Sequence, residues 1–141
     1  MLLKLSVLSA NEDYRRRAVS VLRLVAQPMQ RYPSAFGRAL SAVDFYLSTP
    51  KEIVILGDPD SSETRLLTRE VWKDYLPNKV VVCASAHDES LAQAIPLLQG
   101  RTLSEGHPTA FVCEHYSCLV PVTAPEDLAA QLSSQVAASP K

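Results

Sequence analysis

Apolar side chains recur at helical spacing through residues 1–50. After Asn11, which is placed as a helix N-cap, they fall three or four positions apart, although Pro28 predicts a kink or an end inside this pattern. A second stripe follows "RYPSAF" and stops before Thr49-Pro50. Residues 1–50 therefore predict a helical hairpin, and "MLLKLSVLSA" suits an amphipathic helix. The stripes are Tyr14, Ala18, Leu22, Val25 and Met29, then Phe36, Leu40, Val43 and Leu47.

The pattern changes after residue 51, where β-branched runs replace the helical stripes. "EIVILG" and "PNKVVVC" have no polar alternation, which is typical of strands covered on both faces. Between them, Asp60 and Glu63 have the spacing of a capping box at a helix start. Leu67, Val71 and Tyr75 would then form the apolar stripe of that helix.

The last third of the chain predicts a strand pair and a final helix. "ESLAQAIPLL" predicts a short helix ended by Pro96, and "TAFVC" and "CLVPV" read as strands, with Pro121 marking an edge. Thr123 and Glu126 form a second capping-box pattern. The final helix would be lined by Leu128, Leu132 and Val136, and residues 137–141 would be a disordered tail.

The element order from residue 51 to residue 136 resembles a small thioredoxin-like βαβαββα domain. This resemblance implies a third strand antiparallel to the first two and a cis peptide bond before Pro108. The redox motif of that fold would follow the first strand, but "GDPDSSETR" has no cysteine there. The alternative is a small doubly wound, three-layer α/β domain with a parallel third strand.

The net charge, the number of cysteines and the length of the apolar runs indicate which partners and which cellular compartment to expect. A net charge of −1 and an isoelectric point of about 6.3 argue against a nucleic-acid-binding surface, and the adjacent Arg15, Arg16 and Arg17 point in different directions on a helix. Three cysteines are too few for a disulfide scaffold, so a cytoplasmic location is expected. No apolar run approaches the about 20 residues that span a membrane, and Lys4 interrupts the N-terminal run.

Cys113 and Cys118 are the candidate functional residues. A hairpin turn centred between residues 115 and 116 would make them cross-strand neighbours, close enough for a disulfide. Three interpretations stay open: packed thiols, a reversible redox pair, or part of a metal site. The other side chains for a metal site would be Cys83, His87, His107 and His115.

The remaining motifs do not indicate a cofactor or a catalytic centre. "GDPDSSE" precedes a helix, but it has one glycine and two carboxylates, so it predicts a helix cap and not a phosphate site. No Ser-His-Asp order or paired carboxylates stand out, and we expect no cofactor and no resident metal.

Several motifs together resemble the C-terminal region of the spermatogenesis-associated protein 20 family. They are "NEDYRRRA", "RYPSAFGRALSAVDFYL", "KEIVILGD", "YLPNKVVV" and "PTAFVCEHYSCLVPVTAPEDL". The last motif is the most distinctive, and the chain departs from it at His115, where the family has Asn. The matching positions are Phe111, Val112, Cys113, Glu114, Cys118, Pro121 and Thr123.

The resemblance implies a chain that is one piece of a larger protein. Family members carry a thioredoxin-like domain, then a helical barrel similar to sugar epimerases and six-hairpin glycosidases, then this region. Residues 1–50 would be the last helices of the barrel, and the chain a fragment. We expect a noncatalytic packing domain whose partner is the upstream barrel, with residues 1–48 either dimerising or leaving an apolar surface exposed. The alternative is a contribution to a carbohydrate or thiol-redox site completed by upstream sequence.

Overall fold

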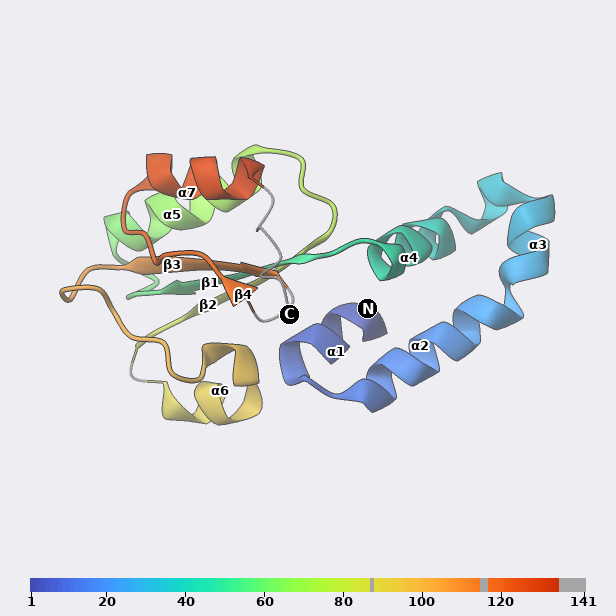
Figure 1. The fold of residues 1–141 in the computed structure, drawn as a ribbon, viewed down its shortest axis with the longest axis horizontal. Helices are drawn as coiled ribbons and strands as arrows, with labels where there is room; N and C mark the ends of the chain where they lie inside the picture. The colour runs from blue at the N-terminus through green and yellow to red at the C-terminus, as the bar shows by residue number, and fades with distance from the viewer. Residues whose placement is uncertain (87, 115–116, 135–141) are drawn as a thin grey trace.

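A computed structural model describes residues 1–86, 88–114 and 117–134. Its N-terminal part is helical and extends to one side of a sheet that has helices on both faces (Figure 1). The final residues of the predicted last helix, including Val136, and the predicted tail lie outside the described residues. The helical part consists of α1 (Leu2–Ser9), α2 (Glu12–Leu24), α3 (Ala26–Arg31), the 3₁₀ turn η1 (Pro33–Phe36) and α4 (Gly37–Leu47).

The first long helix ends earlier than the position of Pro28 suggests. Asn11 caps α2 as predicted, because its side chain accepts a hydrogen bond from the Asp13 amide. The helix then ends at Leu24, four residues before Pro28. A proline ring clashes with the carbonyl four residues earlier, so the break falls there. Pro28 itself lies in the first turn of α3, where its missing N–H costs no helical hydrogen bond.

Four strands form one mixed sheet in the order β2-β1-β3-β4. β1 pairs in parallel with β2, and β3 runs antiparallel to both β1 and β4. The antiparallel third strand is confirmed, and the doubly wound alternative is wrong; the topology is consistent with a small thioredoxin-like α/β domain. The predicted fourth strand is shorter than expected, although Val122 still bridges Ala110. The strands are β1 (Lys51–Leu56), β2 (Lys79–Ala84), β3 (Thr109–Glu114) and β4 (Ser117–Cys118).

Helices cover both faces of this sheet. α5 (Ser62–Lys73) and α7 (Pro125–Ser133) pack on one face, and α6 (Glu89–Ala94) lies on the other (Figure 1). The first core contains Ile53 and Ile55 of β1 with Leu67 of α5 and Leu128 of α7. The second core lies under α6 and the 3₁₀ turn η2 (Pro96–Leu98) and contains Val54, Leu56, Val82, Ala84, Leu98 and Phe111. The helical part joins the sheet through a third cluster, Leu3, Ala18, Phe45 and Val80.

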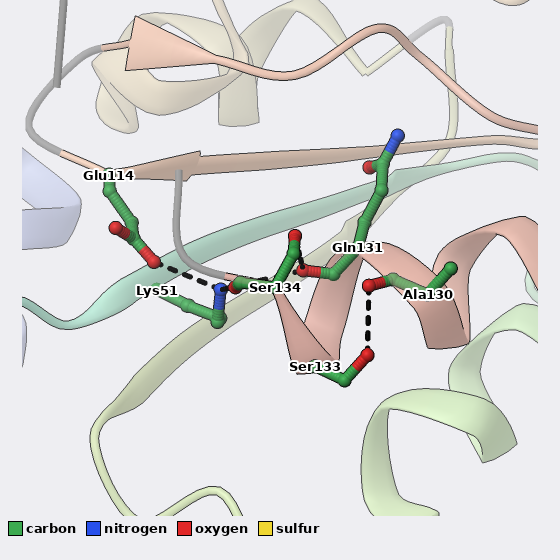
Figure 2. A network of polar contacts seen from close by, with 6 residues as sticks. All are labelled: Lys51, Glu114, Ala130, Gln131, Ser133 and Ser134. Carbon is green, nitrogen blue, oxygen red and sulfur yellow. Dashed lines mark hydrogen bonds and ion pairs between the residues drawn. The ribbon is translucent and has the colours of Figure 1, made fainter. Parts of the chain in front are cut away.

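A polar network fixes the end of α7 to the sheet. The Lys51 ammonium lies 2.9 Å from the Glu114 carboxylate, and both side chains are largely buried. The same ammonium donates to the backbone carbonyls of Gln131 and Ser134 at the C-terminal end of α7 (Figure 2). A cation at a helix C-terminus is favourable because the carbonyls there have no helical partners. The network therefore joins β1, β3 and α7.

Two predicted helix caps are wrong. Ser61, and not Asp60, caps α5 and accepts from the Thr64 amide, while the neighbouring Asp58 carboxylate accepts from the Asp60 amide. At α7 the N-cap is Ala124, and no side chain caps the helix. Proline at the first helical position already supplies a helical φ angle and needs no partner for an N–H. Tyr75 is also misassigned, because it lies beyond α5 and is exposed.

The predicted cis bond is also wrong: the His107–Pro108 peptide is trans. The chain reverses just before it, at Glu105 and Gly106, which both have positive φ angles. The His107 amide donates to the Ser104 carbonyl across this turn. The reversal is complete before Pro108, so the entry into β3 does not require a cis bond.

Candidate functional site

The two candidate cysteines meet at the short edge of the sheet. Cys113 of β3 pairs in register with Cys118 of β4, and the two are joined by a disulfide. Their Cα atoms are 4.0 Å apart. Cys113 is fully buried, whereas Cys118 is exposed. The cross-strand pairing follows the prediction from the sequence; whether the pair has a redox role stays a prediction.

An arginine lies against both sulfur atoms. The Nη2 atom of Arg101 is 3.2 Å from the Cys113 sulfur and 3.4 Å from the Cys118 sulfur. Its Nε donates to the Leu97 carbonyl at 2.6 Å, and its guanidinium lies 4.9 Å from the centre of the Phe111 ring. Burial lowers the pKa of Arg101, and the Glu52 carboxylate opposes that shift. The guanidinium is thus held in place beside the disulfide.

Glu52 is a negatively charged partner for the Arg101 guanidinium on the same face of the sheet. It is buried and stands next to Cys113 in the β1–β3 register. Sequence reasoning missed both Glu52 and Arg101. A carboxylate at the start of the apolar run "EIVIL" was the available signal for Glu52, because buried charges are rare unless they are paired. Nothing in the sequence near Arg101 points to the cysteines, since the contact forms through space.

Of the additional side chains that the metal interpretation needs, only Cys83 and His107 are among the described residues, and they lie apart from each other and from the cysteine pair. Cys83 is exposed on β2 and is a free thiol near the Thr68 hydroxyl. His107 lies 3.7 Å from the Glu63 carboxylate, in a different part of the fold. His87 and His115 lie outside the described residues. Among the described side chains, no group of three His, Cys, Asp or Glu is arranged to hold a metal ion.

A cavity of about 320 Å³ opens where the thioredoxin motif would lie. Gly57, Ser61 and Pro108 are among its lining residues. Gly57 is required for the close approach of these segments, because a Cβ there would lie 2.9 Å from the Pro108 Cβ. The Ser61 side chain caps α5 and the Asp58 carboxylate accepts from the Asp60 amide, so "GDPDSSE" forms a helix cap as predicted. Among the described residues that line this cavity, none is a cysteine.

A larger groove, of about 890 Å³, lies among α1, α2 and α4. Its lining is mainly apolar and includes Leu3, Val21, Leu22, Leu40 and Phe45. Other large apolar side chains of α2 and α4 point to solvent: Leu24 is 80% exposed and Leu47 is 76% exposed. These exposures agree with the second of the two alternatives expected for residues 1–48, an exposed apolar surface, and whether residues 1–48 dimerise stays a prediction. We call this surface the helical face; it comprises Val21, Leu24, Leu40 and Leu47 with the groove beside them.

Curated proteins similar to this chain share one description. Spermatogenesis-associated protein 20 from Homo sapiens is 34% identical over 128 residues, which is 90% of this chain. The proteins of the same name from Rattus norvegicus and Mus musculus are 32% and 30% identical over the same length. The chain belongs to the spermatogenesis-associated protein 20 family. It spans 16% of the length of each of these relatives.

Membership of the spermatogenesis-associated protein 20 family rests on these sequence matches alone. No family model matches the chain, and no solved structure does. Within the described part of the chain, no helix has the length and apolarity that crossing a membrane requires.

Proposed function

We propose that the chain is a noncatalytic packing domain of a larger protein of this family. In this proposal it forms the C-terminal region, and α1 to α4 complete a helical barrel that precedes the thioredoxin-like α/β part. The observation that carries the proposal is the helical face, where apolar residues of α2 and α4 are left without cover. Relatives that are several times longer than the chain provide the sequence that would cover it.

The energetics favour a partner for this face. Burying a Leu or Val side chain fully is worth about 1.5–3 kcal/mol. Leu24, Leu47 and Val21 are each more than half exposed, so most of that free energy is unrealised in the chain alone. Val21 and Leu40 line the same groove, and exposed apolar residues that share one surface mark sites of association more often than isolated ones do.

The occupant that we propose is the helical remainder of the same protein. α2 and α4 present apolar stripes at helical spacing, which suits packing against further helices. The polar side of α2 carries ion pairs at three-residue spacing, Glu12 with Arg15 and Asp13 with Arg16, and so stays solvated. A second copy of the chain is the competing occupant, and the proposed experiment separates the two.

The experiment measures association between the chain and the part of a family member that lies outside the matched region. We expect a one-to-one complex by light scattering and calorimetry. Changing Leu24 and Leu47 to Ser should weaken it at least tenfold, because each loses an apolar contact at the interface. The matched control is Leu66→Ser, which alters a half-exposed leucine of α5 on the far side of the sheet.

Three outcomes would contradict the proposal. One is the absence of a complex with that polypeptide. Another is a complex that the Leu66 control weakens as much as the helical-face variants do. The third is a dimer of the chain alone that the same variants disrupt, which would make the second copy the occupant. Turnover of thiol or sugar substrates by the isolated chain would instead support the enzymatic alternative.

A further inference from the structure

We propose that Cys113–Cys118 is a reducible disulfide in which Cys118 is attacked by an incoming thiolate and Cys113 leaves as a thiolate bound by Arg101. The ligand class is a dithiol reductant. This inference is independent of the helical face, because the disulfide lies at the β3–β4 edge of the sheet and the helical face lies on α2 and α4.

Accessibility decides which sulfur is attacked. An incoming thiolate needs a path to the sulfur, in line with the bond that breaks. Cys118 is exposed on β4, and Cys113 is fully buried in β3. The mixed disulfide therefore forms at Cys118, and the electron pair of the broken bond goes to Cys113.

Arg101 is positioned to stabilise the thiolate that leaves. Its Nη2 donates to the Cys113 sulfur at 3.2 Å and to the Cys118 sulfur at 3.4 Å. A disulfide sulfur is a weak acceptor, whereas a thiolate carries a full charge, so the same contacts become stronger on reduction. Stabilising the reduced form makes a disulfide more oxidising, and a leaving thiol of lower pKa leaves faster.

The charged side chains near the disulfide determine how strongly the Cys113 thiolate is stabilised. Arg101, from the segment after η2, contacts both sulfur atoms, and Glu52, from β1, pairs in register with Cys113 on the same face of the sheet. Lys51 and Glu114 belong to the network on the opposite face, under α7. Arg101 favours the thiolate and Glu52 disfavours it, so the two side chains should have opposite effects when they are neutralised.

The step balances with the dithiol as the two-electron reductant. Its first thiolate attacks the Cys118 sulfur, the sulfur–sulfur bond breaks, and Cys113 becomes a thiolate beside Arg101. The second thiol of the reductant, once deprotonated, attacks the mixed disulfide and releases Cys118. The reductant leaves as a disulfide, and the protein thiolates take protons from solvent according to their pKa values.

The test is the equilibrium and rate of reduction of the chain by dithiothreitol. Cys83→Ser is the background, because the free thiol of Cys83 is exposed. Arg101→Gln should shift the equilibrium about tenfold towards the disulfide, about 30 mV, since an adjacent opposite charge changes an acid's pKa by about 1–3 units and Glu52 offsets part of this. Glu52→Gln should shift it in the reverse direction. Arg69→Gln, on exposed α5 surface, is the matched control.

Thiolate absorbance of the reduced chain gives a second readout. Its apparent pKa should rise by about one unit in Arg101→Gln and fall in Glu52→Gln, whereas a purely structural role would leave it unchanged. Equal behaviour of the Arg101 and Arg69 variants, or trapping of the mixed disulfide on Cys113, would overturn the proposal. If Arg101→Gln does not fold, Arg101→Lys replaces it; this variant keeps the positive charge and should stay closer to wild type. The direction in which Glu52→Gln shifts the reduction equilibrium then tests the proposal.

Discussion

Two leucine substitutions should differ strongly in their effect on the stability of the isolated chain. Leu128 of α7 is fully buried against α5 and the sheet. Leu47, at the end of α4, is 76% exposed. We predict that Leu128→Ala strongly destabilises the chain and that Leu47→Ser leaves its stability nearly unchanged.

The magnitudes follow from burial. Leu128→Ala loses the transfer free energy of the leucine side chain and leaves a cavity among rigid neighbours, so it should cost about 3–5 kcal/mol. Leu47 has only about a quarter of its surface covered, so its substitution should cost about 0.5 kcal/mol. A domain of this size is held by about 5–15 kcal/mol, so only the first substitution threatens folding.

Urea unfolding followed by circular dichroism measures both changes. The midpoint should fall markedly for Leu128→Ala at an unchanged slope, and it should stay within error for Leu47→Ser. A loss above about 1.5 kcal/mol for Leu47→Ser would refute the reasoning, because it would mean that the chain itself, or a second copy of it, covers this side chain in solution.

Two further predictions concern buried lysines. Lys51→Met should cost about 2 kcal/mol, because it leaves the Glu114 carboxylate and the α7 carbonyls without their donor, whereas the exposed Lys73→Met control should cost less than about 0.5 kcal/mol in urea unfolding. Burial lowers the pKa of Lys79, with a smaller contribution from Lys4. The unfolded chain therefore binds more protons above the folded pKa, and the stability of wild type relative to Lys79→Met should rise with pH towards the ordinary lysine pKa. Urea unfolding of both proteins at several pH values measures this. If the free energy of unfolding of wild type relative to Lys79→Met stays constant or falls as the pH rises, the lowered pKa of Lys79 is contradicted.

The sheet could be predicted because its signals are local and redundant. "EIVILG" and "KVVVC" each contain three consecutive β-branched residues, which favour a strand. The caps were harder, because Asp58, Asp60 and Ser61 are close neighbours that can each accept a backbone hydrogen bond. The sequence does not say which of them faces the end of the helix. The cis bond before Pro108 was expected from the resemblance to the thioredoxin fold, but the turn at Glu105 and Gly106 completes the chain reversal without it.

The candidate site was predictable only in part. The Cys113–Cys118 pairing follows from the symmetry of a hairpin and needs no distant contact. Arg101 reaches the pair from the segment after η2, and Glu52 reaches it from β1. Their approach depends on the packing of three separate segments on one face of the sheet, which spacing along the chain does not encode.

The central claim is that the helical face is an internal surface of a larger protein. The most direct measurement is an experimental structure of a complete member of the spermatogenesis-associated protein 20 family, with the accessible area of each residue equivalent to Leu24, Leu40 and Leu47. Our account predicts that these side chains are buried against helices from outside the matched region. If the equivalent positions are apolar and remain exposed to solvent in that structure, the account is contradicted.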